Sequence, residues 1–253
     1  MVRRPLVTAE APRTARTETL SIPRPDAHFG AMAAYLARPA GTGPHPGVVV
    51  IHEIWGLNEN IRDIADRFAS EGYVALAVDL FSGMNRAVCL WRLFRGLVIR
   101  PLRDTPLAEL RRAVDVLQAR PEVDPTRVGV IGFCMGGSYA LQLACVDGDV
   151  RVASVYYGWN PRPLAAVARA CPIVGSYPEL DRPTVRDARK LELALTGYGV
   201  PHDIMIYPGT KHAFANDRRP RRYNSAAAED AWRRTLAFFE QHLGSPGSRP
   251  VQI

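Results

Sequence analysis

A single cysteine stands among glycines in the stretch GFCMGG at residues 132–137. The stretch follows the apolar run 128–133 and precedes a helical pattern, which predicts a strand, a sharp turn and a helix with Cys134 at the apex. A nucleophile at such a turn has a strained backbone, and its flanking residues must be small so that strand and helix can approach each other. Gly132 and Gly136 meet this requirement. We therefore expect Cys134 to be a nucleophile.

The predicted turn also places the sulfur of Cys134 at a helix N-terminus. Free backbone N–H groups and the helix dipole favour a thiolate at this position. Two alternatives are an inert buried thiol and a phosphate-binding loop. A phosphate-binding loop has a lysine with Ser or Thr, or the pattern GxGxxG, and neither occurs here. The sequence therefore favours a nucleophilic role for Cys134, and an inert buried thiol is the remaining alternative.

A cysteine nucleophile needs a neighbouring imidazole that takes its proton, and the imidazole needs an orienting acid. His212 follows the last predicted strand, 203–207, and therefore reaches the carboxyl edge of the sheet, where Cys134 lies. His52 ends a strand at the same edge and is the alternative base. The remaining histidines lie in early loops, before the last strand or on the final helix: His28, His45, His202 and His242.

The orienting acid should follow the preceding strand, 172–177, which leaves Glu179 or Asp181. The chain order nucleophile, acid, base is that of α/β-hydrolases. Asp187 falls inside a helical pattern and is a weaker candidate. We expect Asp181 to be the acid.

Charge that develops on a carbonyl oxygen must be met by fixed donors. The N–H of Met135, after the nucleophile, is one candidate, and the N–H of Ile54, in the loop after strand 47–52, is the second. The same loop would place the carboxylate of Glu53 beside the thiol. Glu53 is either an ordinary ion-paired loop residue or a group that governs the protonation of Cys134, since a nearby anion disfavours a thiolate.

These residues need a sheet that brings strand ends together. The β-branched run 47–52 and the run 74–79 are typical of strands buried on both faces of a parallel sheet. Strands that alternate with helices predict an α/β fold with a mostly parallel sheet, which binds ligands at the carboxyl ends of its strands. Two short strands at 19–22 and 31–38 predict an antiparallel edge. Further strands are expected at 128–133, 152–157, 172–177 and 203–207, and helices from about Asn58 to Gly72, at 107–117, after the turn, at 185–195 and at 228–243.

We expect one domain at 18–244 between flexible tails at 1–17 and 245–253, since 253 residues fit one α/β domain. The segment 82–103 interrupts the strand–helix rhythm after strand 74–79 and is too long for a simple turn. We predict a helical insertion there. It either caps the site or packs elsewhere on the core as an amphipathic helix. Its predicted apolar face comprises Ala87, Leu90, Trp91, Phe94 and Val98, with Arg92, Arg95 and Arg100 toward another face.

Composition excludes several classes of protein. The chain has no apolar run of about eighteen residues, which argues against a membrane span. Its first twenty residues lack an apolar segment and carry two acids, which argues against a secretory signal, and an organellar transit peptide is a minor alternative. The four cysteines are widely spaced without a CxxC pair, so we expect no metal site, no disulfide framework and a cytoplasmic location. We also expect no cofactor.

The net charge of +7 is concentrated in two arginine clusters, at 86–103 and 218–222. Two small clusters are weak evidence for nucleic acid and are more typical of solvated loops, so we expect no nucleic-acid partner. They are compatible with attraction of an anionic small-molecule substrate. We expect a monomer or a small homo-oligomer.

From about Ile22 to Leu243 the chain resembles the dienelactone hydrolases of the α/β-hydrolase superfamily. The resemblance implies a triad of Cys134, His212 and Asp181, with the amides of Ile54 and Met135 as oxyanion hole. It also implies that Glu53 hydrogen-bonds the resting thiol and helps to generate the thiolate once substrate is bound. The type reaction is hydrolysis of dienelactone, an enol-lactone, to maleylacetate. The motifs that carry the resemblance are HEIWGLN, VALAVDLF, GFCMGGSYAL, YYGW, GSYPELD and YPGTKHAFAN.

The sequence departs from the family pattern where the type enzymes hold the substrate carboxylate. The type enzymes carry one arginine soon after the Asp-Leu-aromatic stretch, whereas the first arginine here is Arg86. They carry a second just after the His-x-Phe, where this chain has Asn216 and Asp217 before Arg218. Tyr156 and Tyr157 match a substrate-pocket position. The sequence therefore predicts a hydrolase of a carboxylic ester or lactone that works through a thioester acyl-enzyme. The alternatives are a thioesterase, a biosynthetic tailoring lactonase, and a ligand-binding homologue without turnover.

Overall fold

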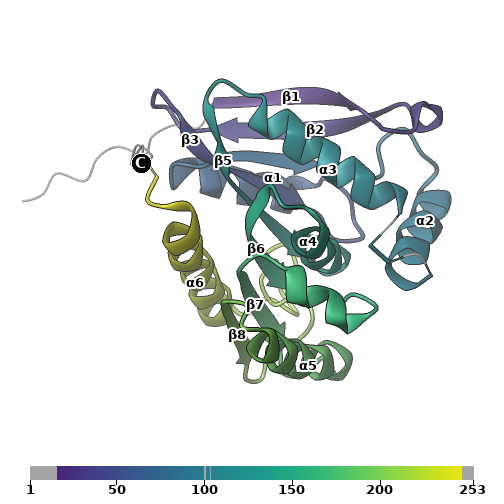
Figure 1. Ribbon diagram of the computed structural model, residues 1–253, viewed down its shortest axis with the longest axis vertical. Coiled ribbons are helices and arrows are strands. Elements are labelled where there is room, and N and C mark those ends of the chain that lie inside the picture. Colours follow the sequence, from purple (N-terminus) through teal and green to yellow (C-terminus); the bar gives the residue numbers. More distant parts are fainter. Residues whose placement is uncertain (1–15, 100, 103, 247–253) are drawn as a thin grey trace, which may run out of the picture.

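The computed structural model describes residues 16–99, 101–102 and 104–246. Eight strands form one sheet in the order β1-β2-β4-β3-β5-β6-β7-β8 (Figure 1). β1 pairs antiparallel with β2, β2 pairs antiparallel with β4, and every other pairing is parallel. This confirms the predicted mostly parallel sheet with an antiparallel edge. The strands are β1 (Arg16–Pro23), β2 (Ala31–Arg38), β3 (His45–Ile51), β4 (Val74–Val78), β5 (Val123–Phe133), β6 (Val150–Tyr156), β7 (Ile173–Pro178) and β8 (His202–Tyr207).

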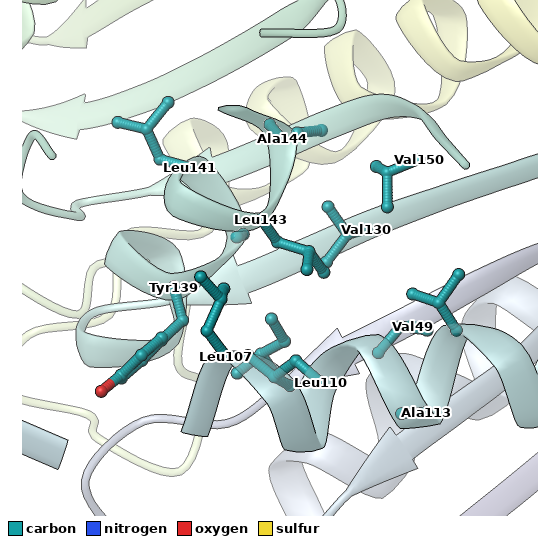
Figure 2. Close-up of a cluster of buried hydrophobic side chains, with 14 of the residues drawn as sticks. Val49, Leu107, Leu110, Ala113, Val130, Tyr139, Leu141, Leu143, Ala144 and Val150 are labelled. Atoms are coloured by element: carbon teal, nitrogen blue, oxygen red, sulfur yellow. The ribbon is translucent and has the colours of Figure 1, made fainter. Parts of the chain in front are cut away.

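Helices cover both faces of the sheet, and each face has its own hydrophobic core. α1 and α6 supply the core on one face, whereas α2, α3, α4 and α5 supply the core on the other. Figure 2 shows Leu107 and Leu110 of α3 and Leu143 of α4 beside Val130 of β5. The helices are α1 (Glu59–Ser70), α2 (Arg86–Val98), α3 (Thr105–Gln118), α4 (Met135–Val146), α5 (Arg182–Tyr198) and α6 (Ser225–Leu243), with short 3-10 helices η1 (Ala27–Phe29) and η2 (Leu164–Arg169).

Two strands are longer than predicted. β5 begins at Val123, five residues before the predicted start, because its pairing with β3 continues past a register shift to His45. β1 begins at Arg16, inside the predicted tail 1–17, because Arg16 pairs with Arg38 of β2. Residues 1–15 of that tail, and residues 247–253 of the predicted C-terminal tail, lie outside the described residues.

The predicted insertion forms α2, but its buried face is not the predicted one. Trp91, Phe94 and Val98 are exposed, whereas Cys89 and Leu93 pack against the core. Leu97 packs there too. Arg100, expected on the polar face, lies outside the described residues. The expected burial of the Trp91 face is therefore wrong.

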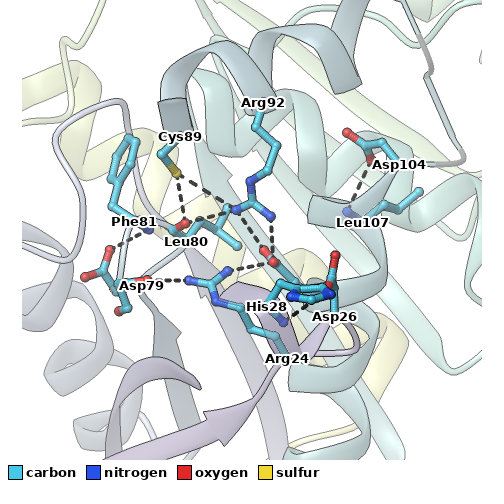
Figure 3. A network of polar contacts seen from close by, with 12 residues as sticks. Arg24, Asp26, His28, Asp79, Leu80, Phe81, Cys89, Arg92, Asp104 and Leu107 are labelled. Carbon is cyan, nitrogen blue, oxygen red and sulfur yellow. Dashed lines mark hydrogen bonds and ion pairs between the residues drawn. The ribbon is translucent and has the colours of Figure 1, made fainter. Parts of the chain in front are cut away.

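Arg92 explains this orientation of α2. Its guanidinium is buried and lies 2.6 and 3.1 Å from the two carboxylate oxygens of Glu109 of α3 (Figure 3). Arg24, which follows β1, contacts the same carboxylate at 2.6 Å. A buried charge is tolerated when it is paired and hydrogen-bonded, so Glu109 draws the Arg92 side of the helix inward. Within the described residues no helix is long and apolar enough to cross a membrane.

Candidate active site

Cys134 lies at a tight turn between β5 and α4, with φ 57° and ψ −116°. Its N–H donates to the carbonyl of Tyr156 at 3.0 Å. A Cβ on Gly132 would lie 2.0 Å from the carbonyl oxygen of Gly136, and one on Gly136 would lie 2.4 Å from the carbonyl oxygen of Ile51. Only glycine fits at either position. The structure therefore has the strand, sharp turn and helix that the glycine spacing predicts.

The environment of the Cys134 thiol keeps it protonated at neutral pH. Burial is the largest cause that raises its pKa, and the negative charge of Glu53 is the second. With the smaller effects of the other neighbouring groups, the pKa is about 12. The Met135 N–H at the start of α4 acts in the opposite direction, as does the charge of Arg219. A helix N-terminus favours a thiolate, but desolvation outweighs it here. Cys134 is therefore a thiol in this environment.

Glu53 lies in the loop after β3, and its side chain is almost fully buried. Its carboxylate accepts hydrogen bonds from the side-chain amide of Asn216 at 3.0 Å and from the hydroxyl of Tyr157 at 3.4 Å. In the part of the chain that the structure describes, Glu53 forms no salt bridge. The carboxylate is held there by two neutral hydrogen-bond donors. The contact with Asn216 was not predicted, although Asn216 lies in the YPGTKHAFAN motif.

The imidazole of His212 and the carboxylate of Asp181 form a close pair. Nδ1 of His212 lies 2.5 Å from Oδ2 of Asp181, so the other ring nitrogen, Nε2, is the one left for proton exchange. Asp181 precedes α5, and His212 follows β8, as expected from the strand order. The alternative acid Glu179 instead accepts a hydrogen bond from the Gly209 N–H at 2.8 Å. Asp187 accepts one from the Asn160 N–H at 3.2 Å.

His52, the alternative base, is fully buried. Its Nδ1 lies 2.5 Å from the carbonyl oxygen of Glu53, and its Nε2 accepts a hydrogen bond from the Leu80 N–H at 3.0 Å. Burial lowers its pKa, which favours the neutral ring. Because both ring nitrogens are engaged, His52 fixes the loop that carries Glu53 and has no free nitrogen for a substrate.

Arg86 stands at the N-terminus of α2 and holds the loop around Ile54. Its guanidinium donates to the carbonyl of Ile54 at 2.7 Å and lies 5.5 Å from the ring centroid of Trp55. Arg219 lies 4.7 Å from the same ring. Arg219 directly follows Arg218, the arginine nearest to the position where the family pattern predicts a second carboxylate-binding arginine. Trp55 therefore stands close to two cations.

The adjacent tyrosines have different surroundings. Tyr157 contacts Glu53 through its hydroxyl, and its ring centroid lies 4.9 Å from that of His212. Tyr156 is buried in the core, with its hydroxyl 3.2 Å from Oγ1 of Thr235 on α6. Both tyrosines pack in the core on the α1 and α6 face, with ring centroids 6.0 Å apart, and the substrate contact of Tyr156 stays a prediction. Among the described residues no group of three or more His, Cys, Asp or Glu side chains is placed to hold a metal ion.

Comparison with known proteins finds relatives along most of the chain. The sequence profile of the dienelactone hydrolase family matches residues 32–243. A protein of Saccharolobus solfataricus with the provisional name carboxymethylenebutenolidase is 33% identical, over 85% of this chain and 96% of its own length. A protein of Synechocystis with the same provisional name is 32% identical, over 90% of this chain and 98% of its own length.

Solved structures show the same fold. The crystal structure of a provisionally named dienelactone hydrolase from Klebsiella pneumoniae aligns with a TM-score of 0.76 and 32% identity. The alignment covers 90% of this chain and 99% of the other. The expected α/β-hydrolase fold is confirmed, since both the topology of the sheet and this alignment agree with it.

Proposed function

Because the chain belongs to the dienelactone hydrolase family and is a hydrolase of esters or lactones, we propose that it works through a Cys134-His212-Asp181 triad and a thioester acyl-enzyme. The observation that carries the proposal is the 2.5 Å contact between His212 and Asp181 on the loops that follow β8 and β7. Those loops lie at the carboxyl edge of the sheet, where the turn after β5 presents Cys134.

In the first half of the proposed reaction, Cys134 attacks the substrate carbonyl. Nε2 of His212 takes the thiol proton, and Asp181 stabilises the imidazolium that forms. The negative oxygen is held by the N–H groups of Met135 and Ile54. His212 then gives the proton to the leaving oxygen as the C–O bond breaks. The product of this half is a thioester on Cys134 and a free alcohol, or a tethered alcohol for a lactone.

In the second half, water attacks the thioester. His212 takes a proton from the water, the C–S bond breaks, and the acid leaves. The sulfur recovers its proton, which restores the resting thiol. The proposed role of Glu53 is to hold that thiol protonated between turnovers, since its anion disfavours the thiolate. Protection of the thiol from alkylation and oxidation would follow.

The proposed substrate is a small ester or lactone, and the cations around Trp55 favour an anionic one. Arg86 and Arg219 both lie against its ring, and Arg219 is near enough to Cys134 for its charge to lower the thiol pKa. Arg86, Tyr156 and Tyr157 remain proposed substrate-binding residues. A cytoplasmic location and a monomeric or small homo-oligomeric state stay predictions.

Substrate panels and a single substitution test the proposal. Cys134→Ala should abolish release of 4-nitrophenolate from 4-nitrophenyl acetate while circular dichroism stays unchanged. A panel of acyl thioesters and macrocyclic lactones distinguishes a thioesterase or a tailoring lactonase by their kcat/KM values. Retained turnover in the alanine variant would refute the nucleophile. Tight ligand binding without turnover by the unaltered protein would favour the non-catalytic homologue.

A further inference from the structure

A cavity of about 330 Å³ opens beside the first turn of α4. Ser138 lines it, four residues after Cys134, which corresponds to about 6 Å along the helix axis. The hydroxyl of Ser138 lies 3.3 Å from the carbonyl oxygen of Cys134. The volume is within the range of small-molecule sites, about 300 to 1,000 Å³. The cavity is therefore large enough for part of a substrate, and its lining begins about one helical turn from Cys134.

One wall of the cavity is an aromatic platform with a fixed backbone. The backbone N–H of Trp159 donates to the hydroxyl of Ser138 at 2.8 Å, and Trp159 as a residue is 42% exposed. The centroid of Phe94 lies 6.3 Å from that of Trp159, so α2 supports the platform. Leu97 and Val98 of α2 also line the cavity. An exposed, rigidly held indole beside aliphatic groups suits a flat apolar ligand.

The rim of the same cavity is cationic. Arg162 and Arg186 line it, and neither guanidinium has a carboxylate within 4.0 Å among the described residues. Asp187, an acid of the same lining, is engaged with the chain beside it: it accepts from the Asn160 N–H, and its carbonyl accepts from the Asn160 side-chain amide at 2.8 Å. Two unpaired guanidinium groups next to an apolar wall suit a ligand that is apolar with a distal anion.

The direction of the reaction decides which part of the substrate reaches this cavity. The leaving oxygen must approach His212, because His212 donates its proton. His212 belongs to the loop after β8, whose next residues, Ala213 and Phe214, pack on the α1 and α6 face of the sheet, whereas α2, α4 and α5, which line the cavity, pack on the other face. The acyl part, which lies on the other side of the carbonyl carbon, therefore faces the cavity.

We propose that this cavity is the acyl subsite, and that it selects an acyl group with a flat apolar portion and a distal carboxylate. The proposal rests on the proposed function of Cys134 and His212. Trp159 stacks against the flat portion, and Arg162 and Arg186 bind the carboxylate. Phe94 and Val98, on the exposed face of α2, form the outer edge of this proposed subsite.

Three 4-nitrophenyl esters with one leaving group test the subsite: the acetate, the 3-phenylpropanoate and the 3-(4-carboxyphenyl)propanoate. The acetate is too short to reach Trp159. Trp159→Ala should lower kcat/KM about tenfold for both arylpropanoates and less than twofold for the acetate. Trp159→Phe should restore most of the loss. Val98→Trp changes an exposed residue and should obstruct the mouth of the cavity. It should therefore lower kcat/KM for both arylpropanoates and change it less than twofold for the acetate.

The rim is tested by a matched pair of substitutions on α5. Arg186→Gln should lower kcat/KM about tenfold for the carboxylated ester and leave the uncharged arylpropanoate within twofold. Arg162→Gln should act in the same direction. Arg189→Gln, an exposed arginine of the same helix outside the cavity lining, should change neither ester. Equal losses for all three esters, or none for either arylpropanoate, would overturn the subsite.

A binding measurement separates the subsite from the chemistry. Isothermal titration of Cys134→Ala with 3-(4-carboxyphenyl)propanoate should give saturable binding, weakened about tenfold by an added Trp159→Ala. If no ester is turned over but this difference appears, the proposed function fails and the subsite stands. If esters are hydrolysed but the acid binds equally to both variants, the subsite is wrong and the proposed function stands.

Discussion

The side-chain amide of Asn216 donates a hydrogen bond of 3.0 Å to the buried carboxylate of Glu53. The two residues come from the loops after β8 and β3, which are separated by most of the chain. The hydroxyl of Tyr157 adds a second donor, so the carboxylate is fixed from two sides. Its charge is one of the causes that raise the pKa of Cys134. A positioned anion therefore helps to keep Cys134 as a thiol.

Glu53→Gln should make Cys134 more reactive toward alkylation. Loss of the anion removes a cause that raises the thiol pKa, so the thiolate fraction at pH 7 to 8 increases. A pKa drop of one unit gives about tenfold faster reaction with iodoacetamide in this range. The measurement is the alkylation rate against pH, read by mass spectrometry of the Cys134 peptide.

Asn216→Ala provides the matched comparison, since it keeps the charge of Glu53 but removes one of its two donors. It should give a smaller shift in the same direction, because the carboxylate is then free to turn away from the thiol. Asp217→Asn, at an exposed neighbour, should leave the alkylation profile unchanged. An unaltered profile in Glu53→Gln would remove Glu53 from control of the thiol.

Arg219→Gln should act in the opposite direction on the thiol. Its charge lowers the Cys134 pKa, so its removal should raise that pKa further and slow alkylation at pH 8. It should also raise KM for anionic esters more than for neutral ones, because the cation beside Trp55 is lost. Arg221→Gln, an exposed arginine of the same cluster, is the control. Faster alkylation in Arg219→Gln would contradict the assigned charge effect.

Glu109→Ala should destabilise the fold by about 3 to 5 kcal/mol, because it leaves two guanidinium groups without their shared carboxylate. Glu109 and both partners, Arg24 and Arg92, are buried. Urea denaturation measures the loss, and limited proteolysis should show earlier cleavage in α2. Glu192→Ala, an exposed glutamate of α5, should change stability by less than 0.5 kcal/mol. Equal stability of the two variants would show that the ion cluster does not hold α2.

The sheet and the turn at Cys134 were predictable from local patterns. β-branched runs separated by helical stripes indicate a parallel sheet, and glycines two residues before and after the cysteine permit the tight turn. The order of strands then placed Asp181 and His212 at one edge. Each of these inferences depends on residues close in sequence or on a general rule of topology.

The orientation of α2 depends instead on residues far apart in sequence. Arg92 turns inward because it pairs with Glu109, 17 positions away, and Arg24, 85 positions before Glu109, binds the same carboxylate. Helical periodicity alone places an arginine in solvent and an aromatic stripe in the core. Here the ion pairs around Glu109 bury Arg92 and leave Trp91 exposed. Burial of the thiol is another long-range property. The sequence predicts that Cys134 lies at a helix N-terminus, which lowers the thiol pKa. It does not predict the burial that raises this pKa by more.

The identity of the covalent intermediate tests the central claim most directly. The enzyme should be mixed rapidly with 4-nitrophenyl acetate, quenched in acid during the burst and digested, and the acetylated peptide should be identified by mass spectrometry. The proposal predicts an acetyl thioester on Cys134 that forms and decays at rates consistent with turnover. Turnover at the same rate with the acetyl group on another residue, or by Cys134→Ala, would contradict it.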